Sequence, residues 1–170
     1  MTIKVSGFTF IKHGLSLGYP FLESILSIEP LCDEIIINVG FTDPQLEKDD
    51  GTFLYLKKHL THPKYIFIKS YWDQQLHTQG SVLAQQTNIA LKACTGDICQ
   101  YIQGDEVIHQ ADLPIIHDAM MELAKSPQHH GLVFDYLHFY GNVDTIKHTR
   151  NIYRREVRTI KNHQNIMSWK

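Results

Sequence analysis

Two neighbouring carboxylates, Asp105 and Glu106, follow a short apolar segment and a glycine in the stretch CQYIQGDEVIH, residues 99–109. The apolar segment has the composition of a buried strand, so the two acids stand at a strand end. A carboxylate beside a glycine can bind Mg²⁺ or Mn²⁺ there, because both cations prefer carboxylate oxygens and a glycine lets a ligand come close. Neighbours on an extended chain face opposite sides, so we expect Asp105 to be the metal ligand and Glu106 to point away. The alternative is a solvated turn that ends the strand.

A second set of polar residues follows the apolar run in CDEIIINVGFTD, residues 32–43. Asn38, Gly40 and Asp43 stand where this run ends, and the same residue types also make a good turn between a strand and a helix. The two interpretations are compatible, because turns at strand ends often carry binding residues. If the two strands are parallel, their carboxyl ends lie at one edge of the sheet, and these polar groups can meet there.

The elements that must position these groups alternate between strand and helix signals along the chain. Runs of β-branched, aromatic and other apolar residues predict strands at residues 3–11, 33–40, 64–70, 97–103, 131–141 and 151–162, the last being one strand or two with a bend. Apolar residues at helical spacing predict helices at residues 20–30, 53–60, 81–95 and 112–126. This alternation predicts one α/β domain over residues 1–170, a three-layer αβα sandwich with a mostly parallel central sheet.

The composition narrows the possible classes of protein. The chain has 170 residues, 43% of them hydrophobic and 20% charged, and its formal net charge of −2 gives no basic surface for nucleic acid. Three cysteines in apolar runs, without framework spacing, predict buried free thiols in a reducing compartment. The histidines His129, His130 and His138 fit no common zinc pattern. We find neither a signal peptide nor an integral membrane segment, and we therefore expect a cytoplasmic protein.

The stretches CDEIIINVGFTD and AQQTNIALKACTGDICQYIQGDEVIH (residues 84–109) together resemble the nucleotide-sugar-binding half of family-2 glycosyltransferases, which have the GT-A fold. SGFTFIKHG and FDYLHFYG extend the similarity from about Gly7 to about Asn162. The resemblance implies an inverting, hexosyltransferase-like enzyme of polysaccharide biosynthesis, which moves a sugar from a UDP-linked donor to a glycan or lipid-linked acceptor. It also implies Mg²⁺ or Mn²⁺ as cofactor, since a divalent cation stabilises the diphosphate that leaves when the sugar–phosphate bond breaks.

The resemblance also assigns roles to residues that match the family pattern. Gln103-Gly104-Asp105 matches the Asp-x-Asp signature, so Asp105 keeps the metal ligand while Gln103 places an uncharged amide near the ribose. Asn38 stands where family members commonly have an Asp near the base or ribose. These two amides weaken the expected metal site but leave nucleoside recognition intact. The expected contacts with the nucleotide sugar are Phe10, Ile11, Asn38, Gly40, Asp43, Thr87, Asn88, Gln103 and Gly104.

Three further features have open interpretations. Trp72 and Asp73 follow a strand and either stack against a sugar or, as we favour, anchor a loop. The stretch YRREVR at residues 153–158 is typical of a charged strand edge, with a phosphate contact as the alternative. The aromatic run at residues 134–140 predicts one face in the core and another beside an acceptor pocket.

Two other functions remain open. A truncated or degenerate module would bind a nucleotide sugar, or only a protein partner, without turnover, and the amides and the short chain favour it. We assign no catalytic base, because none of Asp135, Asp144 and Glu156 has a context that marks it.

A nucleotidyltransferase with a similar sheet would need a glycine-rich, basic loop after the first strand, and FIKHGLSLGYP lacks that character.

Overall fold

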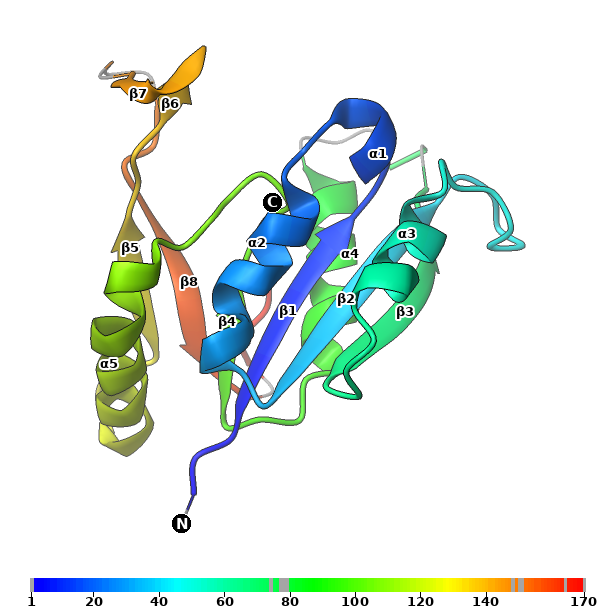
Figure 1. Cartoon of the computed structure of the whole chain (residues 1–170). Helices are drawn as coiled ribbons and strands as arrows, with labels where there is room; N and C mark the ends of the chain where they lie inside the picture. Colours follow the sequence, from blue (N-terminus) through cyan, green and yellow to red (C-terminus); the bar gives the residue numbers. More distant parts are fainter. Residues whose placement is uncertain are drawn as a thin grey trace.

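A six-stranded sheet forms the centre of the computed structural model, with the strand order β3-β2-β1-β4-β8-β5 (Figure 1). The structure describes residues 2–73, 75–76, 80–147, 149, 152–163 and 165–169. Four strands are parallel: β1 (Val5–Ile11), β2 (Glu34–Phe41), β3 (Tyr65–Tyr71) and β4 (Ile98–Tyr101). β8 (Arg155–Lys161) runs antiparallel to both of its neighbours, β4 and β5 (Gly131–Asp135). The mostly parallel sheet confirms the predicted fold class.

Helices cover both faces of the sheet and complete three layers. α2 (Phe21–Ile28), α3 (Thr52–His59) and α5 (Leu113–Lys125) lie on one face, and α4 (Ser81–Lys92) lies on the other (Figure 1). Three shorter helical turns are α1 (Gly14–Leu17), η1 (Glu29–Leu31) and η2 (Gln110–Asp112). No helix in the described ranges is long and apolar enough to cross a membrane.

Apolar side chains fill the space on each side of the sheet. β2 is buried at every one of its residues, as its continuous apolar run predicts for a strand covered on both faces. The larger core packs the sheet against α2, α3 and α5, where Ile25, Leu56 and Met120 are fully buried. The smaller core packs β1 and β2 against α4. All three cysteines are buried free thiols, as predicted: Cys32, Cys94 and Cys99.

The segment between β5 and β8 differs from the prediction. The expected strand at 131–141 stops at the end of β5, and β6 (Phe139–Tyr140) pairs with β7 (Asn142–Ile146) in a hairpin that projects beyond the sheet (Figure 1). The turn is at Gly141, whose φ of +74° a glycine adopts without strain. A core face for residues 134–140 is wrong in the later part of this run, since Leu137, Phe139 and Tyr140 are more than half exposed.

β8 also corrects the prediction of a charged strand edge at residues 153–158. It has hydrogen-bonded neighbours on both sides, β4 and β5, so it is an internal strand of the sheet. Its arginines include Arg158, whose side chain is only 10% exposed.

The strand order reverses at β1, which lies between β2 and β4. β1 is followed by α2 and β2 on one side, while β3 is followed by α4 and then β4 on the other. In sheets of this kind ligands bind beyond the carboxyl ends of the strands, at the point where the order reverses. The segments that follow β1 and β4 converge at this switch point.

Candidate functional site

The loop after β4 packs directly against the end of β1. A Cβ on Gly104 would lie 2.8 Å from Cδ1 of the buried Ile11, so a glycine is the residue that fits there. The hydroxyl of Ser24 on α2 donates a hydrogen bond of 2.6 Å to the carbonyl of Gln103. The structure thus brings Ile11, Gln103, Gly104 and Asp105 together at the switch point. The side chain of Ile11 is buried in the larger core and packs against Gly104, so it links the loop to the core.

Asp105 and Glu106 have different environments, although they lie in a turn beyond the end of β4 and not on an extended strand. The Asp105 side chain is exposed, and no described residue hydrogen-bonds or ion-pairs with its carboxylate. Glu106 instead accepts hydrogen bonds of 3.0 and 2.6 Å from Nε and Nη2 of Arg158, and one of 2.9 Å from the hydroxyl of Tyr136. Glu106 is therefore an anchor within the protein, and Asp105 is the carboxylate that can bind a ligand.

The charges around Glu106 are balanced. Burial would lower the pKa of the Arg158 guanidinium, but the hydrogen bonds and charge of Glu106 outweigh burial and raise it. Burial, and then the charge of Glu106, raise the pKa of the Tyr136 hydroxyl. Arg158 therefore stays charged and Tyr136 stays a hydrogen-bond donor at neutral pH. Because Glu106 and Arg158 neutralise each other, Asp105 supplies the negative charge at this loop.

A partly exposed aromatic pair lies beside the ends of β1 and β2. The rings of Phe10 and Trp72 have centroids 5.9 Å apart, and the Lys12 ammonium lies 4.8 Å from the Trp72 ring centroid. Gly40 leaves the room for them, since a Cβ there would lie 3.0 Å from Trp72 and 3.4 Å from Lys12. Desolvation lowers the pKa of Lys12. Sequence reasoning missed Lys12, although it follows Phe10 by two positions and so shares its face of the strand.

Asn38 is next to Phe10 in the register of β1 and β2, and it is fully buried against α4. Its Nδ2 donates hydrogen bonds of 3.1 and 2.9 Å to the carbonyl and to Oε1 of Gln86. The Gln86 amide is held in turn by Ser70, which donates to Oε1 at 2.5 Å, and by the carbonyl of Tyr71, which accepts from Nε2 at 2.9 Å. These contacts fix the orientation of both amides. They leave Asn38 Oδ1 as a buried acceptor without a partner among the described residues.

Two predicted contacts on α4 use their polar groups within the protein. The Thr87 hydroxyl donates 2.8 Å to the carbonyl of Leu83, one turn earlier in the helix. The Asn88 amide forms two hydrogen bonds with the backbone of Ser168, of 3.1 and 2.8 Å, and so ties the C-terminal segment to α4. Their contacts with a donor stay predictions.

Asp43 lies in an exposed turn after β2. Its carboxylate accepts hydrogen bonds from the backbone N–H groups of Lys48, at 2.7 Å, and Glu47, at 3.2 Å. Desolvation would raise the pKa of Asp43, but these backbone hydrogen bonds lower it. The turn interpretation therefore describes Asp43 well, and a role at the nucleoside stays a prediction.

The residues at the switch point fit a divalent cation whose coordination the substrate completes. In the described part of the chain, no group of three or more His, Cys, Asp or Glu side chains could hold a metal. Mg²⁺ and Mn²⁺ in phosphate-binding sites use one or two carboxylates and take their other ligands from phosphates and water. Asp105, exposed beside the closely packed Gly104, meets that requirement, and Gln103 adds only a neutral amide.

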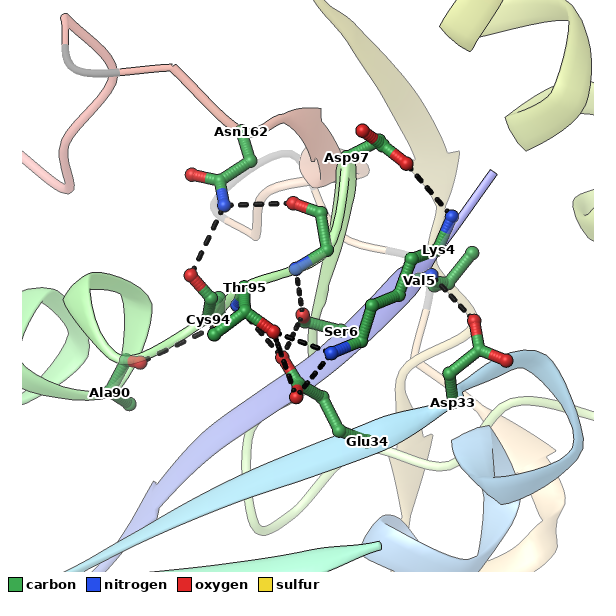
Figure 2. Close-up of polar contacts among 11 residues, drawn as sticks. Lys4, Val5, Ser6, Asp33, Glu34, Ala90, Cys94, Thr95, Asp97 and Asn162 are labelled. Carbon is green, nitrogen blue, oxygen red and sulfur yellow. Dashed lines mark hydrogen bonds and ion pairs between the residues drawn. The ribbon is translucent and has the colours of Figure 1, made fainter. Parts of the chain in front are cut away.

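Another carboxylate with a shifted pKa, Glu34, begins β2 at the end of the strand away from the switch point, and Figure 2 shows its contacts. It accepts hydrogen bonds of 2.8 Å from Lys4, 2.6 Å from Ser6 and 2.8 Å from the backbone of Thr95. Burial would raise the pKa of Glu34, but these contacts overcome it and hold the pKa at about 2. A shifted carboxylate can mark a functional site, but this one is saturated by protein donors at the amino ends of β1 and β2. We therefore infer that Glu34 stabilises the folded protein and does not bind a ligand.

The sheet order and the switch point between β1 and β4 are those of a doubly wound α/β fold, and solved structures of glycosyltransferases are similar to it. The mannosyltransferase PcManGT from Pyrobaculum calidifontis, in complex with GDP-Man and Mn²⁺, matches 77% of this chain with a TM-score of 0.52 and 17% identity. S. aureus TarS 1–349, alone and in complex with UDP, matches 71% of the chain with TM-scores of 0.48 and 0.46 and identities of 15% and 18%. The likeness to PcManGT confirms the predicted fold.

These matches concern the fold and only part of the larger proteins. The chain spans about a third of their length, 35% of PcManGT and 33% of TarS 1–349. No family model and no curated protein sequence matches the chain.

Proposed function

We propose that residues 1–170 act as one nucleotide-sugar-binding domain of a glycosyltransferase. The enzyme takes a sugar from a UDP-linked donor and passes it, with inversion, to a glycan or lipid-linked acceptor in cytoplasmic polysaccharide biosynthesis. The observation that carries the proposal is the exposed Asp105 carboxylate, which a closely packed glycine presents at the switch point between β1 and β4. The similar fold of PcManGT, whose structure contains GDP-Man and Mn²⁺, supports it.

Each side chain has a task that its chemistry permits. Phe10 and Trp72 offer aromatic surface against which a base can stack. The Gln103 amide can bind a ribose hydroxyl. Asn38 is fully buried, so it can affect a nucleoside only through the neighbouring Phe10 and not by a direct hydrogen bond. Asp105 holds Mg²⁺ or Mn²⁺, and the bound cation would offset the negative charge that develops on the diphosphate.

Calorimetric titration of UDP into the protein, with and without Mn²⁺, tests the proposal. We expect Mn²⁺-dependent binding in the wild type and a loss of about tenfold or more in the Asp105→Asn variant, as for removal of a metal ligand. Asp118→Asn is the matched control, because Asp118 is an exposed carboxylate on α5, with 83% of its side chain accessible. A parallel titration with GDP tests the choice of base. Equal Mn²⁺-dependent affinity in the wild type and in Asp105→Asn would refute the role of Asp105.

A binding module without turnover is the second candidate. Amides stand at Asn38 and Gln103, where the resembling family has acids. Sugar release from a UDP-linked donor, measured with an acceptor or with water alone, distinguishes the two candidates. Steady release excludes the binding module, and nucleotide binding without any release supports it.

A further inference from the structure

We propose that Arg158 is a positioning residue for Asp105, and that it acts through Glu106. The inference rests on the proposed function, because it concerns how the chain presents the candidate metal ligand. It gives a function to the ion pair between Arg158 and Glu106. Neither the fold nor the resemblance explains that ion pair.

The turn that carries Asp105 is closed by the Glu106 side chain. The backbone N–H of Glu106 donates 3.1 Å to the carbonyl of Gln103, which closes a turn over Gly104 and Asp105. The Glu106 carboxylate returns to the start of this turn, where Oε2 accepts a hydrogen bond of 3.1 Å from the N–H of Gln103. One carboxylate therefore holds both ends of the turn, and whatever fixes the carboxylate also fixes Asp105.

Arg158 fixes that carboxylate by contacting both of its oxygens. Nε donates to Oε2 at 3.0 Å and Nη2 donates to Oε1 at 2.6 Å, a two-point contact that sets the plane of the carboxylate as well as its position. The arginine comes from β8, an internal strand of the sheet, so the anchor is rigid. The rings of Tyr101 and Tyr136 lie 5.2 and 5.3 Å from the guanidinium carbon and restrict it further.

The same contacts direct this arginine toward the protein and away from a phosphate. Arg158 and Glu106 expose only 10% and 13% of their side chains. The remaining guanidinium nitrogen, Nη1, donates 3.3 Å to the carbonyl of Val157. Each of its three nitrogens thus donates to an acceptor of the protein, and with so little of the side chain exposed, we expect Arg158 to act on a ligand through the loop.

A second ion pair on the same strand provides the comparison. Arg155 and Asp135 also approach to 2.6 Å, but their side chains are 72% and 77% exposed and they join only β8 to β5. An exposed pair of this kind contributes little to stability, so Arg155→Lys controls for the loss of an arginine from β8 and amide exchange at the loop tests positioning itself. A positioning role predicts that only the Arg158 pair affects Asp105.

The test measures Mn²⁺ affinity in the presence of UDP, by the paramagnetic resonance signal of free Mn²⁺. Arg158→Lys keeps the charge but cannot contact both oxygens from one fork, and Glu106→Gln keeps the size without the charge. We expect each variant to bind Mn²⁺ about 10- to 100-fold more weakly, the loss typical when a group that orients a metal ligand is removed. Arg155→Lys should bind as the wild type does. The variants are compared at temperatures where thermal unfolding shows each to be folded.

A second readout needs no ligand. Amide hydrogen exchange at Gln103 and Glu106 should become faster in Arg158→Lys and stay unchanged in Arg155→Lys. Unchanged Mn²⁺ affinity or unchanged exchange in folded Arg158→Lys overturns the positioning role while the proposed function stands. Absence of Mn²⁺ and UDP binding in the wild type overturns the proposed function and this role together.

Discussion

Replacement of Glu34 by glutamine should lower the unfolding free energy by about 3 kcal/mol at neutral pH. Lys4, Ser6 and Thr95 hold the pKa of the Glu34 carboxyl at about 2, below its ordinary value of 4.5. At about 1.36 kcal/mol per pKa unit, this difference corresponds to about 3 kcal/mol. Glutamine keeps the shape of the side chain but removes its charge and replaces one acceptor by a donor.

The same difference sets a pH dependence with a definite sign. The pKa of Glu34 is lower in the folded protein than in the unfolded chain, so acid favours the unfolded chain. The stabilisation is complete above a pH of about 4.5 and is lost as the pH falls towards about 2. The wild type should therefore lose about 3 kcal/mol more than Glu34→Gln across this window.

Urea denaturation followed by circular dichroism, at several pH values between 7 and 2, measures both effects. Glu122→Gln serves as the control, because Glu122 is an exposed glutamate on α5. The reasoning fails if Glu34→Gln lies within about 0.5 kcal/mol of the wild type at pH 7, the range of an ordinary surface substitution. It also fails if the difference between the two proteins does not shrink in acid.

Three further predictions concern the candidate site. Gly104→Ala should destabilise the protein by about 1–3 kcal/mol by overpacking, because its Cβ would lie 2.8 Å from Cδ1 of Ile11. Adding Ile11→Val, which removes that Cδ1, should restore part of the melting temperature. Asn38→Asp would place a carboxyl against two oxygens of Gln86, which raises the pKa of that carboxyl, so stability in urea should fall as the pH rises above about 4. Trp72→Ala should weaken UDP binding by about tenfold or more if a base stacks there, and calorimetry should find Trp169→Ala, at an 84% exposed tryptophan, unchanged.

The predictable parts of the fold are those that local patterns determine. β2 is predictable because a continuous apolar run suits only a strand covered on both faces, and the structure buries all of it. The apolar run that precedes Asp105 and Glu106 likewise predicts a strand, and β4 ends three residues before Gly104. The different directions of the two acids come from the turn over Gly104 and Asp105, so the prediction from an extended chain is wrong in its cause.

The features that the sequence does not predict depend on distant residues. The Glu106 carboxylate is held by Arg158, which is 52 positions away in the sequence. The stretch YRREVR alone does not reveal that β8 is an internal strand of the sheet. The aromatic run that ends at Tyr140 looks like a core strand, yet Phe139 and Tyr140 are more than half exposed. Apolar composition predicts burial only where another element is present to pack against it.

The internal position of β8 has a consequence for the order of folding. β1 to β4 can form their parallel core from the first 101 residues, whereas β8 has to pair with β4 and β5 after residues 155–161 are synthesised. Contacts of long sequence separation tend to form late, since a long loop has to close first. We therefore expect Arg158→Lys to accelerate unfolding and leave the refolding rate nearly unchanged in stopped-flow experiments. The loop proposed to bind the metal then becomes ordered only after β8 has paired with β4. We expect this order both during synthesis and during refolding of the purified protein.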